Sequence, residues 1–399
     1  MLNQSVLKKS LLALAGLLVC GAASAALDEE SSAPAYRFGG VTAYPGMGLV
    51  LKNDSNIFRL ADTNPNKKSS MITVLSPSVV LQAAKDANAY SLAYLIDIGR
   101  YSNSSADNYT DQKLLGQAEF GLSSRSTLKI VPEYLVGHDD RGSTFGTATA
   151  EPNKWHAAGL NGSFAYGAEE SRSSVVVDLG YSDRTYQNNR TLTTAYDKTL
   201  TSTGGTFYFR VQPKTSLLLH AKRTGIAYKQ TGSPLNGNEQ RFMLGVKWEA
   251  TAQTIGEVKV GQLQKKFDTT FPTYTGGSWE GAVRWSPLTF VKVDFVSSKQ
   301  PNETTLTGSS TILVSNTGAN VAYDLNDRVT LHANGYQVKE DFVGANRNDS
   351  TNNFGLKAEY KFRSWLVGGA EYTSSAKTSN NPLNDYKRNI FLLSVRSVL

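Results

Sequence analysis

Alternation of apolar and polar residues, sustained over segments of about 12–17 residues, is the feature that most constrains this chain. It recurs from about residue 46 to the C-terminus. In segment 354–362, for example, apolar or small residues alternate with polar residues or glycine. The first set is Phe354, Leu356, Ala358, Tyr360 and Phe362, and the second is Gly355, Lys357, Glu359 and Lys361. A period of two indicates β-strands, but typical strands of soluble proteins have about five or six residues. Tilted strands that cross a membrane need about 9–11 residues plus some overhang. The segment length therefore favours a membrane barrel over a soluble sandwich.

The connections between these segments fall into two classes, eight tight turns and nine longer polar loops, which alternate along the chain. Outer-membrane barrels alternate short periplasmic turns with longer outer loops in this way. We therefore expect an all-β, transmembrane, antiparallel up-and-down β-barrel of about 18 strands, with 16 as the alternative, and with both termini in the periplasm. A closed sheet pairs every backbone donor and acceptor, as a hydrocarbon environment requires. The predicted strands are 46–60, 70–84, 88–101, 109–123, 125–138, 153–167, 171–187, 196–212, 214–230, 238–251, 254–267, 275–286, 288–299, 309–324, 328–342, 351–362, 364–376 and 386–398.

The N-terminus has the layout of a secretory signal. Lys8 and Lys9 precede an apolar run that ends at the small-residue triplet Ala23-Ser24-Ala25. The run is too short to span a bilayer permanently. We expect residues 1–25 to be removed, together with the single cysteine, Cys20. Residues 26–45 would then form a short periplasmic segment, too short to plug a lumen, and residues 46–399 the barrel.

Proline placement agrees with this division, because most prolines fall in predicted connections. Pro45 is expected to precede the barrel. Pro132 lies inside a predicted strand, where it removes a backbone donor, so we expect a bulge or local bend there.

Composition and residue spacing exclude several classes of function. Without residues 1–25 the chain keeps 39 basic against 34 acidic residues, a net charge of about +5, which rules out a strongly basic nucleic-acid-binding tail. The four histidines, His138, His156, His220 and His332, lack the spacing of a metal site. Phosphate-binding glycine motifs and zinc motifs are absent. We expect no catalytic residues, no metal, no cofactor and no nucleic-acid partner, and hence not an enzyme.

An 18-stranded barrel is wide enough to enclose a water-filled passage. Taking the polar parity of each strand as inward, the candidate pore-lining residues are Asp97, Glu119, Asp178, Tyr208, Arg210, Lys222, Arg241, Lys247, Lys259, Arg284, Lys292, Asp294, Tyr336, Lys357, Glu359 and Lys361. Basic and acidic residues are nearly balanced among all inward candidates. We see no ring of one sign that would select ions, and mutual pairing on a wet wall is the simpler interpretation. A neutral or weakly charged glycan fits such a lumen as well as an anionic one.

Three further features remain open in the sequence. Tyr208 and Tyr336 could stack on sugar rings, although packing against the wall is the more ordinary role of such residues. The loop 139–152 could fold inward as a constriction or face outward. Three basic pairs, Lys67-Lys68, Lys265-Lys266 and Lys387-Arg388, could contact outer-membrane lipid and lipopolysaccharide phosphates, or carry ordinary solvated charge.

The last strand carries Phe391, Leu393, Val395 and Leu399 on one face. This resembles the C-terminal signature that barrel-assembly machinery takes up, although Leu399 stands where an aromatic residue is usual and Ser397 interrupts the face.

The first two hairpins carry the most specific sequence. Asn53-Asp54-Ser55-Asn56-Ile57-Phe58-Arg59 is followed by Ser69-Ser70-Met71-Ile72-Thr73-Val74-Leu75-Ser76-Pro77, and later by Tyr90-Ser91-Leu92-Ala93-Tyr94, Arg100-Tyr101 and Asp107-Asn108-Tyr109. This text resembles the beta-barrel porin 2 family, outer-membrane barrels often encoded in exopolysaccharide or capsule biosynthesis loci. The resemblance implies a Gram-negative outer-membrane protein that exports a polysaccharide. It also implies a separate periplasmic export partner, because this chain has no periplasmic helical-repeat domain. A general or solute-selective diffusion porin and a non-conducting surface scaffold remain alternatives.

Overall fold

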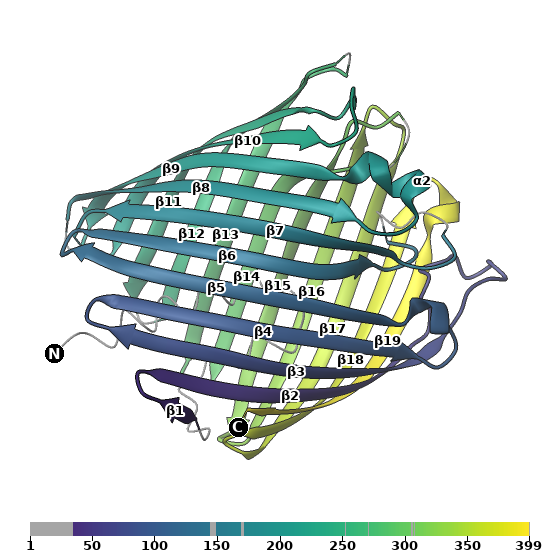
Figure 1. The fold of residues 1–399 in the computed structure, drawn as a ribbon, viewed down its shortest axis with the longest axis horizontal. Helices are drawn as coiled ribbons and strands as arrows, with labels where there is room; N and C mark the ends of the chain where they lie inside the picture. The colour runs from purple at the N-terminus through teal and green to yellow at the C-terminus, as the bar shows by residue number, and fades with distance from the viewer. Residues whose placement is uncertain are drawn as a thin grey trace.

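The computed structural model describes residues 35–143, 149–168, 171–251, 253–269, 271–304, 306 and 308–398. The expected signal segment 1–25 and Leu399 lie outside the described residues. Strands β2 to β19 form a closed antiparallel barrel of 18 strands, and consecutive strands pair throughout (Figure 1). The predicted strand number and fold class are confirmed. No helix among the described residues is long and apolar enough to cross a membrane.

The alternating segments of the sequence become strands of 12 to 16 residues. Their bounds are β2 (Val41–Asp54), β3 (Ser70–Lys85), β4 (Asn88–Tyr101), β5 (Tyr109–Ser123), β6 (Ser126–Asp139), β7 (Asn153–Tyr166), β8 (Ser173–Tyr186), β9 (Lys198–Gln212), β10 (Thr215–Tyr228), β11 (Gly237–Thr251), β12 (Thr254–Phe267), β13 (Tyr274–Leu288), β14 (Val291–Asn302), β15 (Thr311–Asn326), β16 (Val329–Val343), β17 (Asn348–Arg363), β18 (Leu366–Ser379) and β19 (Tyr386–Val398). Short helical turns occur in three of the loops: η2 (Ser105–Asp107), α2 (Arg190–Thr193) with η3 (Thr194–Tyr196), and η4 (Pro382–Asn384).

The barrel closes where the last strand meets the first. β19 pairs with β2 from Ile390 opposite Asp54 to Val398 opposite Gly46. Nine connections lie at one end, which we call the long-loop end. Eight tighter turns and both ends of the barrel lie at the other, the short-turn end (Figure 1).

The first barrel strand begins at Val41, five residues earlier than the sequence predicts. Residues 41–45 pair with β3, and a short strand β1 (Tyr36–Phe38) adds to β2. Pro45 therefore lies inside a strand, not before the barrel. This is tolerated because β19 ends opposite Gly46, so that at Pro45 only β3 pairs with β2. In the sequence, Pro45-Gly46 interrupts the alternation of apolar and polar residues, and the start of the strand is hidden there.

Of the bulge or local bend expected at Pro132, the structure shows no bulge. Pairing between β5 and β6 is interrupted between Leu115–Glu133 and Ala118–Ile130, yet the register is the same on both sides. Pro132 keeps its place opposite Leu160 on β7. Gly116 makes room for the ring, since a Cβ there would lie 2.8 Å from the Cγ of Pro132. A missing side chain, not an extra residue, accommodates the proline.

Exposed apolar side chains identify the outer surface. On β17, for example, Phe354, Leu356 and Phe362 are each about half exposed, while the alternating Lys357 and Glu359 are not. Residues of the exposed apolar parity follow one another across paired strands around the barrel. The opposite parity therefore faces the lumen.

Candidate functional site

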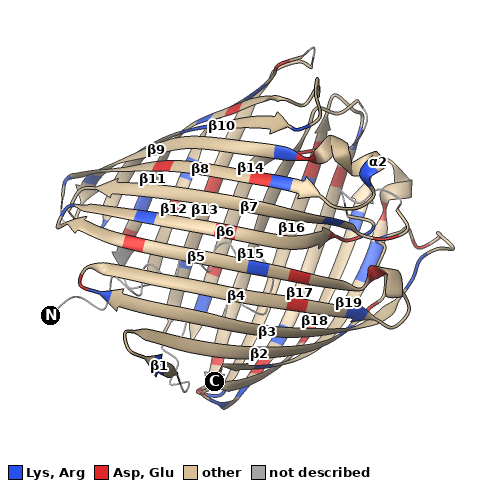
Figure 2. Cartoon of the chain, viewed as in Figure 1, with Lys and Arg blue, Asp and Glu red and all other residues tan. Residues whose placement is uncertain are grey.

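The candidate site is the lumen. All sixteen candidate residues lie on the parity opposite to the exposed apolar side chains, and so on the inner wall. They do not gather into one cluster. Figure 2 shows acidic and basic residues interspersed along the strands, with no band of one sign. Their part in transport stays a prediction.

Many of the inward charges pair with one another, either within one strand or across one or two strands. Lys259 binds Glu280 at 2.9 Å, and Arg241 binds the same carboxylate at 2.8 Å. Lys357 binds Glu359 at 2.9 Å. Such pairs neutralise the wall locally, so the lumen presents hydrogen-bonding groups without a strong field of one sign.

At the short-turn end these inward side chains are accessible to water. Lys292, next to the turn at 289–290, has a side chain that is 54% exposed, and it stands 3.8 Å from Asp324. Arg284 is 44% exposed while bound to Asp294 at 2.6 Å. Inward charges with this much accessible surface indicate a water-filled lumen in this half of the barrel.

At the long-loop end the inward side chains are packed. The ten largest fully buried side chains of the described chain all lie in the long loops or within five residues of them: Lys265, Ile72, Leu263, Ile312, Asn56, Thr193, Thr311, Asp54, Ser70 and Ser310. A wall one strand thick cannot bury a side chain that points into an open channel. The loops must therefore cover the inner wall at this end.

The loop between β14 and β15, residues 303–310, supplies the clearest inward contact. Glu303 accepts a hydrogen bond from the Tyr228 hydroxyl of β10 and stands 3.5 Å from the Nζ of Lys265 on β12. Lys198 of β9 is 3.9 Å away. These three residues point inward from strands two to five places along the wall from β14. Glu303 therefore lies against the inner face of the barrel, away from its own strand.

The charge of Glu303 is stabilised in this position. Burial alone raises the pKa of its carboxyl, but Lys198, Lys265 and the Tyr228 hydroxyl outweigh burial and hold the pKa below its usual value. Lys265, only 2% exposed, also donates to Thr311 Oγ1 at 3.3 Å. We call Glu303, Lys198, Tyr228 and Lys265 the Glu303 latch.

The loop 139–152, which the sequence singled out as a possible constriction, has different contacts. Arg141 binds Asp107 and donates to Ser104 Oγ at 3.1 Å, both in the β4–β5 loop, and its guanidinium lies 4.3 Å from the ring of Phe58. Its described residues thus lie against neighbouring loops. Residues 144–148 are outside the described residues.

Asp140, next to Arg141, also contacts a neighbouring loop through Arg59. Burial raises the pKa of its carboxyl, but the hydrogen bond from His138 and the charge of Arg59, 3.1 Å away, hold the pKa well below its usual value. The described part of this loop is therefore held to its neighbours by the ion pairs Arg141–Asp107 and Arg59–Asp140.

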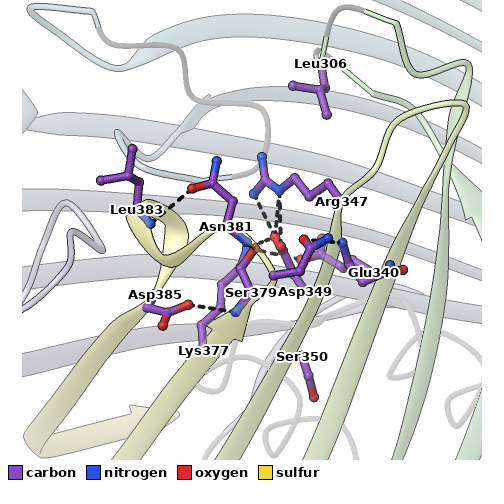
Figure 3. Close-up of polar contacts among 12 residues, drawn as sticks. Leu306, Glu340, Arg347, Asp349, Ser350, Lys377, Ser379, Asn381, Leu383 and Asp385 are labelled. Atoms are coloured by element: carbon purple, nitrogen blue, oxygen red, sulfur yellow. Dashed lines mark hydrogen bonds and ion pairs between the residues drawn. The ribbon is translucent and has the colours of Figure 1, made fainter.

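A third packed cluster joins β16, β17 and β18. Asp349 accepts from Arg347 at 2.7 Å and from Lys377 at 2.6 Å, and Lys377 also reaches Glu340 at 3.4 Å (Figure 3). Asp349 is buried, so its charge depends on these two partners.

In two of the basic pairs only one residue, Lys266 or Lys387, has the outward parity, and its contact with lipopolysaccharide phosphates stays a prediction. Lys265 is buried in the lumen, while Lys266 has the outward parity. Arg388 binds Asp54 at 2.5 Å on the inner face of the β19–β2 seam. Adjacent strand residues face opposite sides, so parity separates each pair. Lys67 is engaged with Asp62 at 2.7 Å in its loop.

Tyr336 lies against the wall. A Cβ on Gly318, directly opposite on β15, would come within 2.2 Å of the Tyr336 ring, so the ring occupies the space over that glycine. Tyr208 has Lys247 Nζ 5.8 Å from its ring centre. Both contacts fit the packing role. Within the described residues, no three His, Cys, Asp or Glu residues gather as a metal site would need.

The model of the family described as "Putative beta-barrel porin 2" matches residues 32–398. The chain belongs to this family. Family and fold together assign the protein to the outer membrane of a Gram-negative bacterium, as a porin-like barrel. No match was found among curated proteins.

Solved structures support the fold of this family member. OccAB3 of Acinetobacter baumannii has a TM-score of 0.51 at 11% identity, covering 91% of this chain and 100% of its own. OccK9 (OpdG) of Pseudomonas aeruginosa has a TM-score of 0.51 at 9% identity, covering 90% and 98%. Identity this low establishes similarity of fold alone.

Proposed function

We propose that this porin-like barrel exports an exopolysaccharide across the outer membrane. The observation that carries the proposal is the contrast within the lumen. A water-accessible wall with locally paired charges suits a hydrophilic polymer, because neither sign of charge holds the polymer in place. The packed long-loop end suits a channel that stays closed until polymer is delivered.

The orientation is part of this proposal. The short-turn end, with both termini, would face the periplasm, and the long loops would face the outside. Polymer would then enter through the water-accessible half, brought there by a separate periplasmic export partner. Barrel-assembly machinery would insert the chain through its last strand.

Deleting the gene tests the export role. We expect polymer to be absent from the cell surface or trapped in the periplasm, and to return when the wild-type chain is supplied. A clean deletion strain with normal surface polymer would refute export.

A solute-selective diffusion porin is the second candidate, and the contact of Glu303 with the inner wall favours it, because a loop residue held there limits the size of solutes. Planar-bilayer recordings separate the two candidates. A large and steadily open conductance supports the diffusion porin, whereas a mostly closed pore supports export. A pore that never conducts, even in the latch variants described below, would indicate a surface scaffold.

A further inference from the structure

On the outer face of β14 to β18, the side chains change from apolar to polar and then to charged, row by row, toward the long-loop end. Residues paired in one row across these strands share a level and a face. The rows are apolar or small up to Phe295, Ala319, Gly335, Phe354 and Ser374. The first fully polar pairs then appear in the next row, at Ser297, Thr317, Gln337 and Asn352.

Hydrogen bonds within that polar row satisfy its side chains. Trp279 of β13 donates through Nε1 to Ser297 Oγ at 2.9 Å, and Ser297 Oγ lies 2.9 Å from Thr317 Oγ1. Gln337 donates to Asn352 at 3.0 Å. An outward tryptophan beside internally paired polar groups is typical of the membrane–water interface. This row therefore marks the edge of the hydrocarbon on this side of the barrel.

Two lysines stand in the next row, just beyond that edge. The row reads Lys299, Ser315, Lys339, Ser350 and Thr378 from β14 to β18. Lys299 Nζ lies 5.6 Å from the ring centre of Trp279. In the part of the chain that the structure describes, the side chain of Lys339 has no carboxylate partner. Two strand spacings, about 10 Å, separate the two strands that carry them.

These residues line a groove with a cavity of about 440 Å³. Buried Leu313 lies among the lining residues, and Asp341, Asn348 and Asn380 continue the lining beyond the lysines. Glu340, Asp349 and Ser379, which belong to the cluster of Figure 3 and have the inward parity, also line the groove. The groove thus combines two cations with hydroxyl, amide and carboxylate groups, directly above an apolar surface.

We propose that this groove binds the phosphorylated sugar headgroup of an outer-leaflet glycolipid of the lipopolysaccharide class. Lys299 and Lys339 pair with the phosphates. Asp341 and the serine, threonine and asparagine side chains bond to sugar hydroxyls, since a carboxylate accepts from a hydroxyl but repels a phosphate. The acyl chains lie on the apolar rows that contain Phe295 and Phe354. The proposal goes beyond the export role and depends only on the outward orientation of the long loops.

Binding of fluorescent deep-rough lipopolysaccharide to the detergent-solubilised full chain tests the groove. We expect Lys299→Ala/Lys339→Ala to bind about 25-fold more weakly, about fivefold for each lysine at a charged membrane surface. Lys299→Arg/Lys339→Arg keeps the charge and should bind as the wild type does. Lys85→Ala/Lys214→Ala is the matched control, which removes two exposed lysines at the short-turn end and should change binding less than twofold.

The choice of lipid distinguishes the occupant. Dephosphorylated lipopolysaccharide should bind the wild type as weakly as lipopolysaccharide binds the double alanine variant. Vesicles of phosphatidylglycerol should compete poorly, because they offer a phosphate without the sugars. Equal binding by the wild type and the double alanine variant would overturn the proposal, and so would equal competition by phosphatidylglycerol. Heat-shifted gel mobility confirms that each variant is folded.

The orientation is checked separately. Thr231→Cys, in a long loop, should react with a membrane-impermeant maleimide on intact cells. Absence of labelling would remove the basis of the glycolipid site. Normal surface polymer in the deletion strain would instead refute export and leave the glycolipid site standing.

Discussion

The two ends of the lumen use the same kinds of residue in opposite ways. Near the short turns, Arg284–Asp294 and Lys292–Asp324 are ion pairs in water. Near the long loops, Glu303–Lys265 and Asp349–Lys377 are ion pairs among buried side chains. Exposed pairs contribute about 0–1 kcal/mol, whereas breaking a buried pair costs about 3–5 kcal/mol. Loop packing, not composition, makes one end rigid and leaves the other end a passive wall.

The largest effect is expected from Glu303→Ala. It leaves buried Lys265 without its carboxylate, at a cost of up to about 3 kcal/mol to the loop packing. The loop should leave the inner wall, and single-channel conductance or open time in planar bilayers should rise clearly above that of the wild type. Glu303→Gln, which keeps a partner for the Tyr228 hydroxyl, should have a smaller effect. Unchanged conductance in Glu303→Ala would mean that the latch does not limit the lumen.

Acidification should act on the same latch more weakly. The pKa of Glu303 is lowered in the folded loop, so its stabilising contribution is complete above the ordinary carboxyl pKa near 4.5 and is lost as pH falls through the lower folded value. Conductance of the wild type should therefore rise only below about pH 4. Recordings across pH 3–7 check this expectation, with Glu303→Ala as the control that lacks this transition. A rise of equal size in that variant would assign the transition to other carboxyls.

Removing Arg141 should loosen a loop without opening the lumen. Arg141→Ala leaves buried Asp107 with fewer donors, which costs about 1–3 kcal/mol locally. We expect faster proteolytic cleavage in loop 139–152, with a conductance change smaller than that of Glu303→Ala. Protease time courses on the reconstituted protein measure the first effect, and bilayer recordings measure the second. A conductance rise as large as that of Glu303→Ala would show that this loop also narrows the lumen.

The smallest effect is expected in the water-accessible half. Lys292→Ala breaks an exposed pair worth about 0–1 kcal/mol. Thermal stability and conductance should stay close to wild type, with only a slight shift of reversal potential toward cations in a salt gradient. A strong loss of conductance would place the narrowest point near the short turns and reverse the comparison.

The barrel itself could be predicted from the sequence because its signals are local. Alternation gives the strands, and turn length gives their order around the wall, so most strand bounds agree within three residues. The first strand was predicted at 46–60, five to six residues beyond its observed bounds Val41–Asp54, because Pro45-Gly46 hides the alternation at its start. The parity of each strand also placed the sixteen lumen candidates on the inner wall.

The latch could not be predicted in the same way. Glu303 and Tyr228 are 75 positions apart, and no period or motif connects them. One part of the latch could have been predicted, because the alternation along the strand assigns Lys265 to the inside and Lys266 to the outside. Which loop residue contacts the wall depends on how side chains from three strands fit together, and that is a property of the closed barrel.

The seam between β2 and β19 joins the two extremes of the chain. Asp54 and Arg388, which bridge it, are 334 positions apart. Until β19 pairs with β2, the sheet has two open edges. The unpaired amide and carbonyl groups of these edges would promote aggregation. Because β19 is synthesised last, the barrel can close only after this strand is present. A chain shortened by this one segment would lose the entire cylinder, because no partial ring is compatible with hydrocarbon.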